Sequence, residues 1–200
     1  GMLFLGMQFM SGAVRPHRAL LAPLLAHVDG TTLPGMLAGI GWALLVTGTI
    51  QSSGATIGMA FALIDAGVLT SLEQVFPIII GANIGTCVTA LVGTLGADIE
   101  ARRSAVSHLL FNLFSAGAAI AAAPWFFRWM PAWTPDLTHQ AANANTLKML
   151  LSALVVLPFA PWHARIARFL VPSRRAPRPP SFLDPGLRAM PEQALSACIR

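Results

Sequence analysis

The feature that most constrains this chain is a series of apolar segments, several of them about as long as a helix needs to cross a bilayer. Charged residues make up only 10% of the sequence, against roughly 25% in an ordinary soluble domain. So few charges cannot cover a water-facing surface, and the apolar residues form blocks rather than one face of a soluble helix. We therefore expect an all-α membrane protein. Its main apolar blocks cover residues 33–50, 55–69, 75–95, 105–125 and 147–162.

The positive charge of the chain favours a membrane topology over nucleic-acid binding. The net charge is +5, but the arginines lie in short loops and in the tail after Pro161, and no basic stripe with interleaved aromatic residues occurs. By the positive-inside rule the tail is cytoplasmic, on the same side as the charged loop from Asp98 to Arg103. The expected location is the inner (cytoplasmic) membrane, with several crossings and contact with lipid.

A polar tip, Gln51-Ser52-Ser53-Gly54, separates two apolar arms and predicts a helical hairpin. The polar apex favours a re-entrant hairpin, although two full spans remain an alternative. The amide and the two hydroxyls can donate to an oxyanion or offer oxygens to a hard cation. A second arm that begins near Gly54 adds helix N-terminal amides, which bind anions. The alternative is that the small residues only allow helices to pack closely.

A second polar motif, Gly81-Ala82-Asn83-Ile84-Gly85-Thr86, lies inside the third apolar block. Its two glycines and its asparagine predict a break in the helix, which would free carbonyl oxygens for sodium, as in transporters with discontinuous helices. If the helix continues instead, Asn83, Thr86 and Thr89 share one face. That face could also serve only to hydrogen-bond a neighbouring helix.

Other polar residues in the apolar blocks give weaker signals. Asp65 is a coupling-site candidate as an intramembrane acid, or it reaches the interface from a helix end. His108 and Asn112 are four residues apart and favour hydrogen-bonded packing inside the bundle. No Ser/His/Asp, HExxH or Walker pattern occurs. We therefore do not expect an enzyme.

With these motifs in place, the sequence resembles the type II sodium-dependent phosphate cotransporters, in particular their bacterial branch. The resemblance lies in the tip followed about thirty residues later by the second motif. It extends to Gly6-Met7 with Met10-Ser11, to Arg102-Arg103 with His108 to Leu113, and to Ala142-Asn143 with Thr146. It implies one half of an inverted-repeat transporter, with the order of features of the second repeat. The segment from Leu183-Asp184 through Pro191 resembles the entrance to a PhoU-like cytoplasmic helical region.

The resemblance also implies the site. It assigns the tip residues to phosphate and sodium, places the second motif beside them, and makes Na⁺ the coupling ion with no organic cofactor. Sodium would be held through Gln51, Ser53, Asn83 and Thr86. The substrate and sodium residues it implies are Gln51, Ser52, Ser53, Gly54, Asn83, Gly85, Thr86 and Thr89.

Three positions depart from the family pattern. Gly54 stands in place of a third serine, which removes one hydroxyl ligand. Asn145 stands in place of a histidine, and Lys148 in place of an aromatic residue. Lys148 is either a new anion contact or, at lower cost, a side chain that snorkels to the interface.

These observations predict a membrane domain over residues 1–163, a basic Pro-rich linker over 164–181 and the start of a cytoplasmic helical region over 182–200. The expected function is sodium-coupled symport of inorganic phosphate. Its partner is the first repeat, in cis or on a second chain, with a homodimer as one arrangement. The alternative is a transport-incompetent membrane module for assembly or for regulating phosphate signalling.

Overall fold

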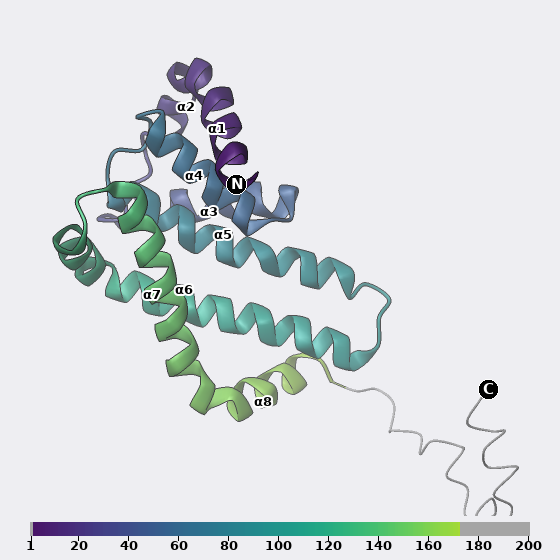
Figure 1. The fold of residues 1–200 in the computed structure, drawn as a ribbon. Coiled ribbons are helices and arrows are strands. Elements are labelled where there is room, and N and C mark those ends of the chain that lie inside the picture. Colours follow the sequence, from purple (N-terminus) through teal and green to yellow (C-terminus); the bar gives the residue numbers. More distant parts are fainter. Residues whose placement is uncertain (1, 173–200) are drawn as a thin grey trace, which may run out of the picture.

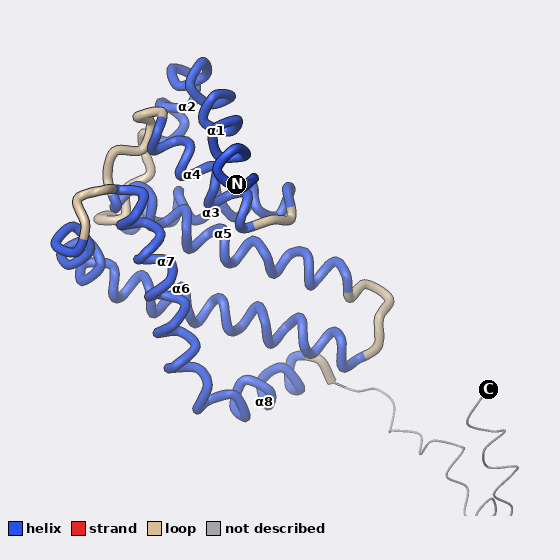
Figure 2. The backbone as a smooth tube through the Cα atoms, viewed as in Figure 1, coloured by secondary structure: helices blue, strands red, loops and turns tan. Residues whose placement is uncertain are grey.

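The computed structural model describes residues 2–172, and every element in that range is helical (Figure 1 and Figure 2). The all-α fold expected from the sequence is therefore confirmed for this part of the chain. In order, the elements are α1 (Met2–Val14), the 3-10 turn η1 (Arg15–His17), α2 (Arg18–Leu25), α3 (Leu33–Ile50), α4 (Ser53–Asp65), α5 (Leu72–Gly93), α6 (Ile99–Trp133), α7 (Leu137–Val156), the 3-10 turn η2 (Leu157–Phe159) and α8 (Ala160–Leu170).

Four polar side chains define where helices begin. Thr32 caps α3 by accepting from the Gly35 amide, and Ser52 caps α4 by accepting from the Ala55 amide. The carboxylates of Asp98 and Asp136 do the same for α6 and α7, each at 2.8 Å. Such caps satisfy amides that the first helical turn leaves without a partner. Short polar residues in this sequence therefore punctuate its apolar blocks.

Four stretches of the described chain are long and apolar enough to cross a membrane: α3, α5, α6 and the run Leu137–Leu170 that contains α7 and α8. α4 has only 13 residues, so it is about 20 Å long and shorter than a hydrocarbon core of about 30 Å. Leu45, Leu150 and Leu154 are exposed on the outside of the bundle. That surface is suited to lipid or to a further protein segment.

α5 is the central helix of the bundle and contacts α3, α4, α6 and α7 (Figure 1). Residues 75–85 of this helix are all buried, including Val75, Phe76 and the run of three isoleucines from Ile78 to Ile80. The Phe76 ring packs against Phe126 of α6, with ring centroids 4.9 Å apart. An all-round apolar surface is what a helix enclosed by others requires.

The expected break in the third apolar block is wrong, because α5 runs unbroken from Leu72 to Gly93. The glycines serve a different purpose, which is the close approach of α3. A Cβ on Gly81 would clash with the carbonyl oxygen of Ile40, and a Cβ on Gly85 would lie 2.5 Å from Cβ of Thr47. Small residues at such positions let two membrane helices come close together.

The last described helix changes the chain's predicted partition. Residues 164–170, expected to open the linker, belong to α8. Nε of Arg103, near the start of α6, donates to the Val171 carbonyl oxygen at 3.1 Å, so the start of α6 and the end of α8 lie at one end of the bundle. Residues 99–103, which the sequence predicted as part of a charged loop, belong to α6. The rest of the predicted linker and the predicted cytoplasmic region, residues 173–200, lie outside the described residues.

Candidate functional site

The polar tip between α3 and α4 is a tight, hydrogen-bonded turn. Gln51 ends α3 with φ of 58°, and it is the one non-glycine residue with positive φ among those described. The left-handed conformation costs a side-chain-bearing residue about 1–2 kcal/mol, and glycine is the usual solution at a helix end. The next residue, Ser52, is extended and caps α4. A glutamine kept in a strained position suggests that its side chain is needed.

The start of α4 presents unpaired amides beside exposed oxygens. The Ala55 and Thr56 amides are bonded to the Ser52 hydroxyl and carbonyl oxygens. The amides of Ser53 and Gly54 have no acceptor within residues 2–172. Gln51, Ser52 and Gly54 are exposed, and Ser53 is half-buried. This end of α4 therefore combines amide donors, hydroxyls and the positive end of a helix dipole.

A relay of hydroxyl groups anchors the tip from below. Thr47 Oγ1 donates to Thr56 Oγ1 at 2.8 Å, and Thr56 Oγ1 donates to the Ser52 carbonyl oxygen at 3.2 Å. Thr47 and Thr56 are both fully buried. The relay joins the two arms of the hairpin and continues to Gly85, which packs against Thr47. Thr47 therefore links the two motifs, because it hydrogen-bonds Thr56 beside the tip and packs against Gly85 of the second motif.

The second motif presents its polar residues with increasing exposure along α5. Asn83 is 7% exposed, Thr86 is half-buried and Thr89 is exposed. Nδ2 of Asn83 donates to the Ile79 carbonyl oxygen at 2.9 Å and to Oδ1 of Asn145 on α7 at 3.3 Å. The Thr86 hydroxyl donates to the Asn83 carbonyl oxygen. Asn83 therefore contacts α7, as in the packing alternative, and Asn145 is a partner that the sequence did not pair with it.

The register of α3 against α5 decides which residues reach the tip. The pairs Gly81 with Ile40 and Gly85 with Thr47 show that the two helices run parallel, and Gly48 packs against Val88. Gln51 is three residues past Gly48, so it is level with the end of α5. Thr89 is close to that level, whereas Asn83 lies about 12 Å before it at 1.5 Å per residue. No hydrogen bond joins the side chains of the two motifs within the described residues.

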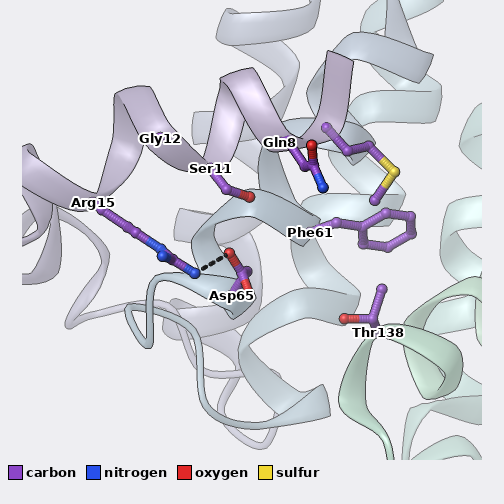
Figure 3. Close-up of a pocket in the computed structure, with 8 residues that line it drawn as sticks. Gln8, Ser11, Gly12, Arg15, Phe61, Asp65 and Thr138 are labelled. Atoms are coloured by element: carbon purple, nitrogen blue, oxygen red, sulfur yellow. Dashed lines mark hydrogen bonds and ion pairs between the residues drawn. The ribbon is translucent and has the colours of Figure 1, made fainter. Parts of the chain in front are cut away.

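The remaining sequence candidates lie elsewhere. Asp65 Oδ2 forms an ion pair of 2.9 Å with Arg15, and both side chains are half exposed or more. They line a cavity of about 510 Å³, together with Gln8 and Ser11 of α1 and Thr138 of α7 (Figure 3). The sequence offered no signal for this pairing across 50 residues.

His108 and Asn112 do not share a buried position, and the snorkelling predicted as one alternative for Lys148 is wrong. Asn112 is buried and donates to the His108 carbonyl oxygen, whereas the His108 side chain is exposed. Lys148 does not snorkel to the interface, because it is 3% exposed within the bundle. The residues that could bind an anion are thus those of the tip and, separately, Lys148.

Among the described residues no group of three or more His, Cys, Asp or Glu is placed to hold a metal ion, so a sodium site would use hydroxyl, amide and carbonyl oxygens.

Fold and site together define a multi-pass helical membrane protein with an oxygen-rich helix tip. The family model described as Na⁺/Pi-cotransporter matches residues 1–129. The chain belongs to this family, which is a family of transporters and not of enzymes.

Individual relatives agree with that assignment. YqeW of Bacillus subtilis, an uncharacterised protein, is 26% identical over 153 residues, which are 76% of this chain and 48% of YqeW. Human sodium-dependent phosphate transport protein 2C is 31% identical over 106 residues, 48% of this chain and 18% of that protein. The rabbit protein 2A is 30% identical over 103 residues, 46% and 16% respectively. The chain thus spans about half of YqeW and less than a fifth of the mammalian proteins. No solved structure matches it significantly.

Proposed function

We propose that this chain supplies one half of a sodium-coupled site for inorganic phosphate transport. The observation that carries the proposal is the start of α4, where the amides of Ser53 and Gly54 are unpaired beside the exposed Gln51 and Ser52. Relatives named as sodium-dependent phosphate transport proteins support the choice of cargo and coupling ion. The fold alone would not identify the cargo or the coupling ion, because one helical bundle can serve many functions.

The geometry suits an oxyanion without a basic residue at the tip. Phosphate oxygens accept hydrogen bonds, and the tip offers two backbone amides, the Gln51 amide group and the Ser53 hydroxyl as donors. Sodium needs only oxygen ligands, and the Gln51 and Ser53 side chains supply them. Thr89 is the residue of α5 best placed to add one more. In this proposal Asn83 and Thr86 support the site through the α5–α7 contact.

We further propose that the hairpin of α3 and α4 is re-entrant. α4 is too short to cross the hydrocarbon core, and irregular backbone at membrane depth must face protein or a water-filled cavity. A second tip from the other half of the transporter would complete that cavity. Alternating access then follows from rocking of the two halves around a fixed site.

We also propose an orientation for the bundle in the membrane. Arg102 and Arg103 lie at the end of the bundle where α8 carries Arg165 and Arg168. Positive charge concentrates on the cytoplasmic side of membrane proteins. We therefore place this end of the bundle and the tail after it in the cytoplasm.

Equilibrium binding tests the site. Radiolabelled phosphate is titrated against the purified chain, alone and combined with a second motif-bearing half, in sodium and in choline. We expect sodium-dependent binding that Ser53→Ala weakens by about tenfold or more. Ser104→Ala, which removes an exposed hydroxyl from α6, should leave binding unchanged. Binding that is equal in sodium and choline would contradict the coupling claim.

Gly54 supports a second candidate function, a transport-incompetent membrane module. It leaves the tip with one hydroxyl fewer than a serine would provide, which would weaken a sodium site. Under this alternative the combined halves bind phosphate without sodium dependence and carry no uptake into vesicles. Sodium-dependent uptake would exclude it.

A further inference from the structure

Lys148 is the chain's single lysine, and it lies in the middle of a membrane-capable helix. It is the twelfth residue of α7, so it is about 16 Å from the start of that helix. Only 3% of its surface is exposed. The arginines among the described residues lie elsewhere, in η1, in α8 or towards the ends of α2 and α6. Lys148 is therefore a basic side chain in the middle of α7, a position that none of the described arginines occupies in its own membrane-capable helix.

This ammonium group has no compensating charge in the described part of the chain. The three ion pairs found there involve Asp65, Glu100 and Asp136, and none includes Lys148. Removing an ammonium from water is costly unless an anion and further hydrogen-bond partners replace the water. An intramembrane ionisable residue is therefore a functional candidate, and an anion is the partner that would compensate its charge.

Lys148 lines a cavity of about 210 Å³ between α6 and α7, which we call the lysine cavity. Its walls are mostly apolar and include Phe114, Phe126, Leu151 and Val155. Two hydroxyls also line it, those of Ser115 and Ser152, which are buried and 2.6 Å apart. Ser152 is one turn from Lys148 on the same face of α7. No carboxylate is among the lining residues.

The donor count favours a bound anion. Each serine hydroxyl has one hydrogen, and the pair uses one of the two for its own bond, so the other remains free. The ammonium adds three donors. An apolar cavity with a few convergent polar groups is the usual form of a small-ligand site. The absence of competing carboxylates leaves its field positive.

The helix that carries Lys148 also contacts the second motif. Asn145 lies one turn before Lys148 on α7, and its Oδ1 accepts from Asn83. Asn145, Lys148 and Ser152 are three and four residues apart and therefore share one face of α7. This face bonds to α5 through Asn145 and to α6 through Ser152.

From this geometry we infer that Lys148, with the hydroxyls of Ser115 and Ser152, forms a second anion site, and that its ligand is inorganic phosphate. The choice of phosphate rests on the proposed function, whereas the anionic character of the ligand rests on the site itself. The site is distinct from the tip, and its helix α7 contacts the second motif through Asn145. It places a basic side chain in the bundle, whereas the tip has only dipoles.

The single lysine makes a direct test feasible. The full 200-residue chain is labelled with ¹³Cε-lysine and placed in lipid nanodiscs, so that Lys148 gives the one lysine signal in the NMR spectrum. Inorganic phosphate is titrated in, with sulfate and chloride in separate series. We expect a saturable shift of the Lys148 signal with phosphate, at concentrations where chloride leaves it unchanged. The measurement needs no mutation and does not depend on a variant that folds.

Two variants test the assigned donors. Ser152→Ala should weaken phosphate binding by about tenfold, read on the Lys148 signal, and Ser104→Ala is the matched control without effect. Lys148→Met should lose phosphate binding in the lysine cavity, and calorimetry on a Gln51→Ala background isolates that loss from the tip. A Lys148 signal that ignores phosphate, or that shifts equally with chloride, would overturn the inference.

The outcomes also separate this inference from the proposed function. If the Lys148 signal responds to phosphate but vesicles show no sodium-dependent uptake, the transport proposal fails and the second anion site stands. If uptake is sodium-dependent but the Lys148 signal does not respond to phosphate, the second anion site fails and the transport proposal stands. Gln51→Ala should abolish uptake while the response of Lys148 is retained.

Discussion

The buried hydroxyl of Thr47 on α3 donates to the hydroxyl of Thr56 on α4 across 2.8 Å. The Thr56 hydroxyl in turn donates to the Ser52 carbonyl oxygen at the tip. Thr47 is held in turn by Gly85 of the second motif, whose missing side chain leaves room for it. This single bond therefore connects the packing of α3 on α5 with the shape of the tip.

Thr47→Val should destabilise the hairpin, because it keeps the shape of the side chain and removes the donor. The Thr56 oxygen would lose its buried partner at a cost of about 1 kcal/mol. Thermal unfolding in detergent would measure the difference. Thr49→Val is the control, since the Thr49 hydroxyl is exposed and donates only to the Leu45 carbonyl oxygen of its own helix. Equal effects of the two variants would show that the relay contributes nothing.

Gly85→Ala should be more harmful than an alanine at an open glycine of the same bundle. Its Cβ would overlap with Thr47, and overpacking of this kind costs about 1–3 kcal/mol. Gly41→Ala is the control, because nothing lies within 4 Å of the added Cβ and alanine favours helix by about 1 kcal/mol. Unfolding temperatures should shift in opposite directions. A neutral Gly85→Ala would mean that α3 and α5 do not approach as closely as described.

Gly54→Ser should strengthen sodium binding. An added Cβ at this position meets no atom within 4 Å, so the serine fits and returns a hydroxyl to the tip. One additional neutral ligand is worth about 1 kcal/mol, which corresponds to about a fivefold lower sodium concentration at half-saturation. The sodium dependence of phosphate binding would show it, with Gly54→Ala as the control. An identical shift in both variants would assign the effect to helix propensity.

Asp136 should titrate below the ordinary range of a carboxyl group. Its pKa is lowered mainly by the hydrogen bond from the His139 backbone amide, and further by the His139 side chain. A lowered pKa means that the stabilisation of α7 is present at neutral pH and is lost as the pH falls through the folded-state pKa. NMR of labelled aspartate would follow it. His139→Ala should leave most of the lowering, because the amide remains, and a return to the ordinary pKa would contradict this assignment.

The tip could be predicted from sequence because its signal is local. Four polar residues between two apolar arms suffice to end one helix and begin another, and the structure places helix ends at Ile50 and Ser53. The all-helical fold followed from the long apolar blocks for the same reason. Such patterns depend on neighbours in sequence, which are visible in a single chain.

The errors arose where the answer depends on distant residues. Gly81 and Gly85 suggested a break in the helix, but they allow the close approach of α3, whose contacting residues lie some forty positions earlier in the sequence. Snorkelling was the cheaper of two alternatives for Lys148, but the side chain is buried beside a cavity between α6 and α7. The bond between Asn83 and Asn145 spans 62 residues. Glycine alone does not reveal whether it serves a bend or a close approach, and the cost of burying a lysine is set by groups that fold against it.

The most direct test of the central claim is phosphate uptake by vesicles that contain the assembled transporter with Gln51→Gly. Glycine relieves the left-handed strain at this position, so the variant should unfold at the same temperature as the parent or higher. If Gln51 holds phosphate or sodium, sodium-driven uptake should nevertheless fall by at least about tenfold. A stable Gln51→Gly protein with undiminished uptake would show that the tip is only a turn between two helices, and would contradict the account.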